Sequence, residues 1–418
     1  MDGTDFDMTL TRADFESLDA NDPLRSFREE FHVPDGVVYL DGNSLGALPK
    51  KTPERIRALV EDEWGHGLIR SWNAHGWIQY PRRIGDQIAT LIGAEPGEVV
   101  AADTTSVNLF KLLAAGVELA PDRRVIVSEK ENFPTDLYIA QGLTKLLGTH
   151  ELRLVGRSDL KAAIDTDVAV VSLTHVDFRS GEVHDMAGIT SHAHERGAAV
   201  LWDLSHSAGA LPVHLNDAGA DFAVGCGYKY LNGGPGAPAY LFVAERHQDN
   251  VNPPLSGWLG HEAPFAFDTD YRPASGIDRQ QCGTPSILAM AALEVGVEIH
   301  TRVDKALLRK KSQELGDLFL QLVDERCEGL GLNTACPRDA TQRGSQVSLR
   351  HTESYPIMQA LIARGVIGDF RAPDVLRFGF TPLYLRFTDI WDGVAILKEI
   401  LETEAFRRPE FQERHLVT

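Results

Sequence analysis

The chain has 418 residues, with 41 Lys or Arg against 60 Asp or Glu, so its formal net charge is −19. This acidic balance argues against a nucleic-acid partner and against anionic membrane surfaces, because both need a basic face. The four cysteines are too few and too scattered for a disulfide framework or a zinc site. No apolar run approaches membrane-spanning length, and the acidic first 22 residues are unlike a signal peptide. We therefore expect a cytoplasmic protein with a large core and no metal.

The N-terminal part predicts an arm followed by helices. Apolar side chains at helical spacing indicate a helical arm over residues 12–30. A short strand is expected at 37–40, and helices at 53–67 and 82–92. Between these helices, residues 70–77 are polar and aromatic and have no clear period.

From residue 98 the chain alternates between short apolar strands and helices. The strands are expected at 98–102, 124–128, 152–155, 168–173, 198–203, 221–224 and 239–244. The helices between them are expected at 105–116, 134–147, 158–164 and 185–196. This pattern predicts an α/β fold with a large, mainly parallel sheet covered by helices on both faces. Ligands of such sheets bind at the carboxyl ends of the strands.

The C-terminal part predicts a smaller α/β unit. Residues 253–285 are typical of a long ordered loop, and a long helix follows over 286–328 with a break near 303. Strands are then expected at 346–349 and 376–380, with helices at 355–364 and 389–403. We predict an N-terminal arm and part of the small domain (1–50), a large domain (51–300) and a small C-terminal domain (301–418).

Two charged residues at neighbouring strand ends indicate a specific chemistry. Lys229 lies after a buried strand, in a glycine-rich turn between Tyr228 and Tyr230, and Asp203 ends another strand. Pyridoxal 5′-phosphate needs such a pair, because a lysine amine binds its aldehyde and a carboxylate holds the proton on its ring nitrogen. Alone, each residue is more simply a surface lysine or a loop-capping aspartate. Together they predict a pyridoxal-phosphate site.

Other residues that follow strands on the same edge suit this cofactor. Thr105 and Ser106 place hydroxyl groups ahead of a helix, where a phosphate group binds well. Phe133 offers a flat face for a pyridine ring. Each also has an ordinary alternative, because Ser and Thr caps are common and a lone histidine is more often structural. The remaining candidates on this edge are Asp136, Thr174 and His206.

An amino-acid substrate needs a planar cation for its carboxylate group. Arginine binds carboxylates with two parallel hydrogen bonds, and the C-terminal part offers Arg371 and Arg377. Strand alternation would bury Arg377, and a buried arginine needs a partner. That partner is either a substrate carboxylate or an aspartate of the protein.

Several motifs occur in an order that resembles the kynureninase family. They are Tyr39–Gly46, Phe133–Asp136, Asp203–His206, Tyr228–Gly236, Ser256–His261 and Arg377–Tyr384. The likeness runs from about residue 20 to the C-terminus and is closest to the bacterial enzymes. No motif is specific alone, but together they are highly specific.

The resemblance implies a fold-type-I pyridoxal-phosphate enzyme, related to class V aminotransferases, that works as a homodimer with shared active sites. Lys229 would carry the cofactor and Asp203 would pair with its ring nitrogen. The other implied cofactor residues are Thr105, Ser106, Phe133, Asp136, Thr174, His206 and Tyr228. Trp258 and Thr284 correspond to residues that the neighbouring subunit contributes on the phosphate side. Arg377 would bind the substrate carboxylate, and Ser44, Trp72 and His75 would form an aryl-ketone pocket.

The implied reaction is the hydrolytic cleavage of L-kynurenine to anthranilate and L-alanine, a step of tryptophan catabolism. We hypothesise that Tyr228 supplies the proton that the β-carbon of the new alanine needs, because Tyr228 adjoins Lys229. The sequence leaves open whether 3-hydroxykynurenine is also a substrate, although the likeness to bacterial members favours the unhydroxylated compound.

Three alternative functions share the cofactor site. A cysteine desulfurase needs a nucleophilic cysteine on a small-domain loop, whereas Cys327 falls in a predicted helix and Cys336 lies in an unrelated Thr-Ala-Cys-Pro segment. A non-catalytic cofactor binder would not need Arg377 or an aryl pocket. A transaminase would release a keto acid and its cyclised quinoline product instead of alanine and anthranilate.

Overall fold

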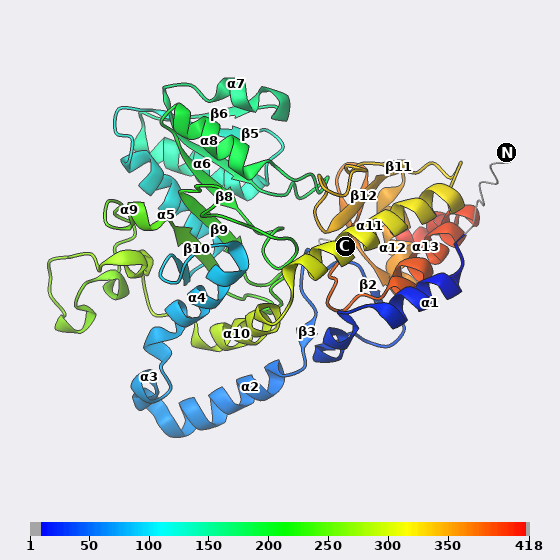
Figure 1. Cartoon of the computed structure of the whole chain (residues 1–418), viewed down its shortest axis with the longest axis horizontal. Helices are drawn as coiled ribbons and strands as arrows, with labels where there is room; N and C mark the ends of the chain where they lie inside the picture. Colours follow the sequence, from blue (N-terminus) through cyan, green and yellow to red (C-terminus); the bar gives the residue numbers. More distant parts are fainter. Residues whose placement is uncertain (1–9, 415–418) are drawn as a thin grey trace, which may run out of the picture.

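The structure, a computed structural model, describes residues 10–414. Figure 1 shows a larger lobe, mainly cyan and green, and a smaller lobe that combines the blue start with the orange and red end of the chain. Helices α10 (Ile287–Thr301) and α11 (Lys305–Arg326) lead from one lobe to the other, so the helix break near 303 is confirmed. Among residues 10–414, every helix is too short or too polar to cross a lipid bilayer. The first nine residues of the acidic N-terminal segment lie outside the described residues.

The larger lobe is built on a seven-stranded sheet. Its strands lie in the order β4 (Val99–Ala101), β10 (Ala239–Val243), β9 (Phe222–Cys226), β8 (Ala199–Asp203), β7 (Val168–Thr174), β5 (Val125–Glu129) and β6 (Glu151–Val155). Only β10 runs antiparallel to its neighbours within this sheet. The mainly parallel sheet is therefore confirmed, and the carboxyl ends of β5, β7, β8 and β9 share one edge.

Helices cover both faces of this sheet, which is why its strands are apolar throughout. In β9, Phe222 and Val224 pack in one core with α5 and α6, whereas Ala223 packs on the other face in a core with α4, α8 and α10. Besides α10, the helices of this lobe include α4 (Tyr80–Ile92), α5 (Thr105–Glu118), α6 (Pro134–Leu147), α7 (Leu160–Ala163), α8 (Met186–Glu195) and α9 (Glu245–Gln248).

The first helical segment of this lobe is wider than an α-helix along half of its length. Helix α2 (Thr52–Ala58) continues as a π-helix over Leu59–Gly67, and short helical turns that include α3 (Ser71–Ala74) follow. Within this π-helix, Glu63 joins the segment to the turns that follow, because its backbone carbonyl accepts from the Ser71 hydroxyl at 2.5 Å and its carboxylate accepts from the Trp77 indole at 2.7 Å. The segment at 70–77 is thus helical in short pieces, where the sequence shows no period.

The smaller lobe has an antiparallel sheet packed against helices. Its strands lie in the order β11 (Asn333–Thr334), β12 (Gln346–Arg350), β15 (Val375–Gly379) and β14 (Asp369–Arg371). Helices α1 (Arg12–Asn21), α11, α12 (Ser354–Ala363) and α13 (Phe387–Glu402) contribute to the same core. Two further strand pairs join β13 (Val366–Ile367) to β2 (Val38–Tyr39) and β1 (Phe31–His32) to β3 (Leu48–Pro49). The domain limits at residues 50 and 300 stay a prediction. The prediction is supported by the core of the smaller lobe, to which both ends of the chain contribute.

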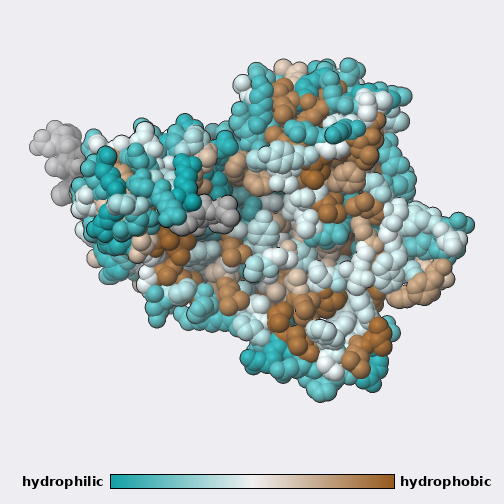
Figure 2. Space-filling model, turned by 180° about the vertical axis from the view of Figure 1, so that it is seen from behind, coloured by the Kyte–Doolittle hydropathy of each residue, from teal (hydrophilic) through white to brown (hydrophobic). Residues whose placement is uncertain are grey.

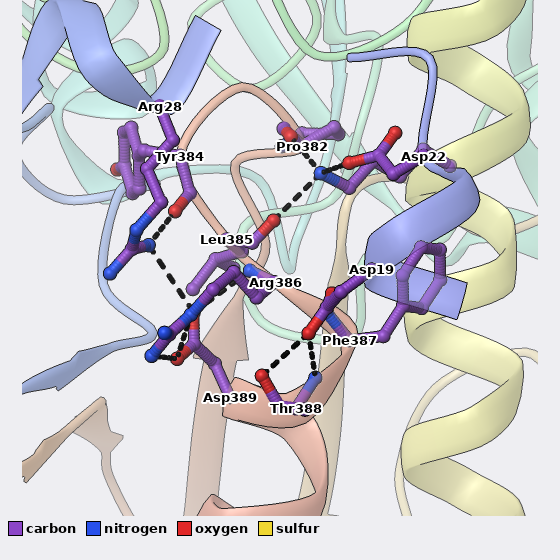
Figure 3. Close-up of polar contacts among 11 residues, drawn as sticks. Asp19, Asp22, Arg28, Pro382, Tyr384, Leu385, Arg386, Phe387, Thr388 and Asp389 are labelled. Atoms are coloured by element: carbon purple, nitrogen blue, oxygen red, sulfur yellow. Dashed lines mark hydrogen bonds and ion pairs between the residues drawn. The ribbon is translucent and has the colours of Figure 1, made fainter. Parts of the chain in front are cut away.

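A buried polar cluster fastens the N-terminal arm to the segment after β15 (Figure 3). The Lys311 ammonium on α11 donates to the Asp22 carboxylate at 2.6 Å and to the carbonyls of Pro382 and Leu385 at 2.6 and 2.7 Å. The Asp19 carboxylate accepts from the backbone amide of Phe387, at the start of α13, at 2.6 Å. The arm is therefore tied to the chain just beyond the strand that carries Arg377.

We expect Lys311→Met to lower the free energy of unfolding by about 3–5 kcal/mol, because a buried carboxylate and two carbonyls lose their shared donor. Denaturant titration of the purified protein measures this. The control is Lys310→Met, which changes an exposed neighbour on the same helix (71% exposed) and should stay within about 0.5 kcal/mol of the unmodified chain. Equal unfolding midpoints for the two variants would contradict a stabilising role of the Lys311 contacts.

Candidate functional site

Lys229 lies at the carboxyl edge of the large sheet, in the turn after β9. Its side-chain nitrogen is 3.0 Å from Nε2 of His206 and 5.8 Å from the centre of the Phe133 ring. The 41–46 loop of the N-terminal part packs against this turn, where the Gly46 amide donates to the Tyr228 carbonyl at 2.8 Å. A Cβ on Gly46 would lie 2.3 Å from the Lys229 carbonyl oxygen, so only glycine allows this approach. The structure thus brings Lys229, His206 and Phe133 together.

Asp203 and Thr174 lie side by side, because the parallel pairing of β7 and β8 ends on this pair. The buried Asp203 carboxylate accepts from the Ser205 amide at 2.7 Å. Asp136, in the first turn of α6, lies close enough for its carboxyl group to share a hydrogen bond with Asp203. Burial raises the pKa of both carboxyl groups, and the charge of Asp203 raises that of Asp136 further. The site therefore holds two carboxyl groups that disfavour being charged at the same time.

His206 is held as a neutral imidazole. Burial lowers its pKa well below the usual range, and the nearby charges of Lys229 and Arg377 act in the same direction. Nε2 faces Lys229, while Nδ1 is buried without a hydrogen-bond partner among the described residues. A neutral imidazole at this position can exchange a hydrogen bond with the lysine amine or with a bound ligand.

Thr105 and Ser106 form the first turn of α5, which begins just beyond β4. The Thr104 hydroxyl caps the helix by accepting from the Val107 amide at 3.3 Å, so the free amides of Thr105 and Ser106 suit an anion. Below them the fully buried Lys111 ammonium donates to Asp103 at 2.8 Å and to the Gln280 carbonyl at 2.7 Å. This helix start can therefore bind an anionic group at the edge of the sheet.

The donors and acceptors at this edge fit pyridoxal phosphate. Two buried polar atoms, Oδ2 of Asp136 and Nδ1 of His206, have no hydrogen-bond partner within residues 10–414, so both are free to meet a ligand. The Phe133 ring remains 38% exposed, so it can receive a flat ring, and Phe178 packs edge-on against it at 5.2 Å. An amine, a carboxylate, an aromatic face and a helix N-terminus are the groups that this cofactor needs.

Arg377 lies on β15 beside the same edge, and its partner in this structure is an aspartate. Its Nε donates to Oδ1 of Asp369 at 2.8 Å, and Nη2 contacts the other oxygen of that carboxylate. Nη2 also donates to the Ser44 hydroxyl at 2.9 Å, and Nη1 donates to the Phe178 carbonyl at 2.6 Å. The aspartate partner that the sequence left open is therefore present, and Ser44 lies with the arginine.

Asp369 and Phe178 were missed by the sequence reasoning. Asp369 lies directly opposite Arg377 in the antiparallel pairing of β14 with β15, a pairing that favours opposite charges. Asp369 could have been predicted as the partner of Arg377 if the short strand β14 had been recognised in the sequence. Phe178 lies in the turn between β7 and α8, and it contacts both Phe133 and Arg377. No sequence pattern marks that connection, because it depends on tertiary packing.

Four predicted residues lie in another part of the larger lobe. Trp72 and Thr284 line one cavity of about 360 Å³, and His75 caps the end of α3 as an exposed residue. Trp258 packs edge-on against Phe265 at 5.7 Å. Figure 1 draws α3 and the yellow-green 253–285 segment at the side of the lobe that points away from the smaller lobe. Within one chain the structure therefore does not bring Trp72, Thr284, His75 or Trp258 to the cluster of Ser44 and Arg377.

The cysteines do not suit a desulfurase. Cys327 caps the end of α11 and is buried, and burial raises the pKa of its thiol to about 11. Cys336 lies just after β11, and burial raises the pKa of its thiol as well. A raised pKa disfavours the thiolate that a nucleophile needs.

Solved structures with the same fold include pyridoxal-phosphate enzymes. A cysteine desulfurase from Thermococcus onnurineus NA1 superposes with a TM-score of 0.76 and 22% identity, over 90% of this chain and 98% of that chain. A C-DES mutant with glycine covalently linked to its PLP cofactor superposes with a TM-score of 0.73 and 18% identity, over 94% of this chain and 100% of that one. At such identities the likeness concerns the fold alone, and it confirms the fold-type-I architecture.

Sequence comparisons identify the family. Residues 308–397 match the family model of the kynureninase C-terminal domain. The chain is 54% identical over 414 residues to the kynureninase of Burkholderia pseudomallei (strain 1106a), covering 98% of this chain and 100% of that protein. It is 52% identical over 414 residues, with the same coverage, to the kynureninase of Pseudomonas fluorescens. The chain therefore belongs to the kynureninase family.

Proposed function

We propose that this protein uses pyridoxal 5′-phosphate to cleave L-kynurenine hydrolytically into anthranilate and L-alanine. The full-length likeness to bacterial kynureninases carries the proposal. The cluster of Lys229, Asp203 and Phe133 at the sheet edge supports it, because these residues provide the groups that the cofactor chemistry requires.

The cofactor, when bound, supplies an electron-withdrawing ring that stores the charge left on the substrate's α-carbon. Lys229 holds the cofactor through its amine and moves the α-proton, and neutral His206 keeps that amine in place at 3.0 Å. Asp203 would hold the proton on the ring nitrogen by remaining charged. Phe133 would offer its face to the ring, and the amides and hydroxyls of Thr105 and Ser106 would hold the phosphate group.

The substrate lies between the sheet edge and the smaller lobe in this proposal. Arg377 attracts its carboxylate group through its positive charge and a charge-assisted hydrogen bond. The Asp369 carboxylate and the Phe178 carbonyl fix the guanidinium plane before the substrate arrives. This preorganisation places the α-carbon next to Lys229 and limits the freedom that would otherwise be lost on binding.

Tyr228 is the proton donor to the β-carbon of the alanine fragment, which keeps the electron pair of the bond that breaks when anthranilate is released. Burial raises the pKa of its phenol, so Tyr228 carries its proton at neutral pH. We expect Tyr228→Phe to lower kcat by about 10²-fold, because one positioned proton donor is lost. Anthranilate fluorescence measures the rate. The control is Tyr138→Phe, which removes a hydroxyl from a side chain that is 65% exposed on α6. If kcat is unchanged in Tyr228→Phe, Tyr228 is not the proton donor.

We also propose a homodimer in which Trp258 and Thr284 complete the phosphate end of the partner's site, while Trp72 and His75 reach its aryl pocket. Exposed apolar side chains near these residues support a covered surface: Trp64, Leu68, Ile69 and Leu288 are 55%, 58%, 77% and 43% exposed. Figure 2 shows hydrophobic surface at the end of the molecule that carries α2 and α3. Sedimentation as a monomer would contradict the dimer.

The cysteines bear on where the protein works. Four unpaired cysteines support a reducing, cytoplasmic location.

The test of the function is direct. Purified protein loaded with pyridoxal phosphate is mixed with L-kynurenine, and the loss of kynurenine absorbance is followed together with the blue fluorescence of anthranilate. Equal amounts of anthranilate and L-alanine are expected, and 3-hydroxy-L-kynurenine in a parallel assay determines the substrate preference. Formation of a keto acid and its cyclised quinoline product, without anthranilate, would replace the hydrolase with a transaminase.

A further inference from the structure

Arg377 has almost no free hydrogen-bonding capacity in this structure. A guanidinium group offers five N–H donors. The Asp369 carboxylate accepts from Nε and Nη2 of Arg377, the Ser44 hydroxyl accepts from Nη2, and the Phe178 carbonyl accepts from Nη1. One N–H of Nη1 therefore remains for a ligand, whereas a carboxylate that binds an arginine in a bidentate manner needs two.

Arg371 lies beside this group and is more accessible. Its Nη2 is 2.7 Å from Oδ2 of Asp369 and 3.4 Å from the Ser44 hydroxyl, and its Nη1 donates to the Phe370 carbonyl at 3.1 Å. Its side chain is 34% exposed, against 2% for Arg377. The Nε of Arg371 and one N–H of its Nη1 take part in none of these contacts within residues 10–414, so both can donate to a ligand. Arg371 therefore has free N–H donors, whereas the neighbouring Arg377 has only one.

The charges of this group leave room for an anion. Asp369, which is 1% exposed, is shared by two guanidinium groups, and they hold its pKa below the usual range although burial acts against them. Asp41 is the other acid nearby, and burial together with the charge of Asp369 raises its pKa to about 7. Arg371, Arg377 and Asp369 together carry one net positive charge, and the raised pKa of Asp41 weakens the negative charge that could cancel it, so a substrate carboxylate suits this group.

We propose that Arg371 is a second residue that binds the substrate's carboxylate group, and that Asp369 holds Arg371 and Arg377 together as one receptor. The inference rests on the proposed function for the identity of the substrate. Ser44 lies between the two guanidinium groups and orients both. Arg377 then contributes its remaining N–H and its charge, and Arg371 contributes its free donors.

The test compares a carboxylate with its amide. For Arg371→Gln, the KM for L-kynurenine is expected to rise roughly 10- to 100-fold, because a charge-assisted hydrogen bond is lost. The kcat should change much less, since the reacting atoms are not touched. For L-kynurenine amide, which lacks the carboxylate, the variant and the unmodified enzyme should differ by less than about threefold. Arg364→Gln is the control, because this arginine pairs with Glu399 on the surface.

A binding measurement makes the test independent of turnover. Calorimetric titration of the holoenzyme with L-alanine should show weaker binding in Arg371→Gln, whereas titration with L-alaninamide should not. Arg371→Lys should recover part of the affinity for L-alanine, which separates loss of charge from loss of structure. If the variant weakens acid and amide equally, or neither, the inference is wrong. If the unmodified enzyme releases no anthranilate, the proposed function fails, and the L-alanine titration still decides the role of Arg371.

Discussion

Lys229→Ala is expected to lower the rate of anthranilate release from L-kynurenine by at least about 10³-fold. The lysine has two roles, as the amine that holds the cofactor and as the base that moves the α-proton, and a positioned acid-base group alone contributes about 10²–10⁴-fold. His206 lies 3.0 Å away but is held neutral by burial, so it is a weak base and cannot replace the lysine. Anthranilate fluorescence measures the loss.

Borohydride reduction followed by peptide mass spectrometry provides a second readout. In the unmodified holoenzyme, the reductant should fix the cofactor to the peptide that contains Lys229. Lys310→Ala is the control, because that side chain is 71% exposed and pairs with Glu314 on the next turn. A Lys229→Ala variant that keeps more than a tenth of the activity, or a cofactor fixed to another lysine, would overturn the assignment.

Much of the larger lobe was predictable because its signals are local. The helix over residues 134–147 has the same bounds in the sequence pattern and in the structure, since Pro134 fixes its first turn and Gly148 its end. The apolar strands are buried on both faces, so they stand out as continuous hydrophobic runs. Parallel strands end on one edge, and this geometry brings Asp203, Thr174 and Lys229 together without any knowledge of side-chain packing.

The parts that were not predictable depend on contacts between distant segments. The strand β14 has only three residues, so no periodicity can show it, and the Asp369–Arg377 pair remained hidden with it. The π-helix after α2 contains Glu63, whose partners Ser71 and Trp77 follow eight and fourteen residues later. In both cases tertiary packing overrides the local preference of the chain.

A different limit applies to residues that act from a second copy. Trp258 and Thr284 were predicted for the cofactor site, yet one chain places them with Phe265 and Trp72, away from the smaller lobe. Neither local periodicity nor the fold of a single chain can join them to Lys229. Their role stays a prediction that depends on the dimer.

The two buried carboxyl groups beside Lys229 should respond very differently to the same substitution. Asp203→Asn is expected to lower kcat/KM by about 10²–10³-fold, because the protonated ring nitrogen loses the fixed negative charge that stabilises it. Asp136→Asn is expected to cost less than about tenfold. Its carboxyl group has a strongly raised pKa, so the neutral amide resembles the protonated acid in size and charge. The kcat/KM for L-kynurenine, from anthranilate fluorescence, measures both.

The difference follows from the partners of each group. Asp203 accepts a hydrogen bond from the Ser205 amide at 2.7 Å, whereas the charge of Lys229 favours the ionised form of both carboxyl groups. Asp136 has a buried oxygen with no donor among the described residues, so its charge would be unsupported. Two carboxylates in contact cannot both stay ionised at low cost, and the better-supported one, Asp203, keeps the charge. A reversed ranking, with Asp136→Asn nearly inactive and Asp203→Asn active, would assign the ring-nitrogen contact to Asp136.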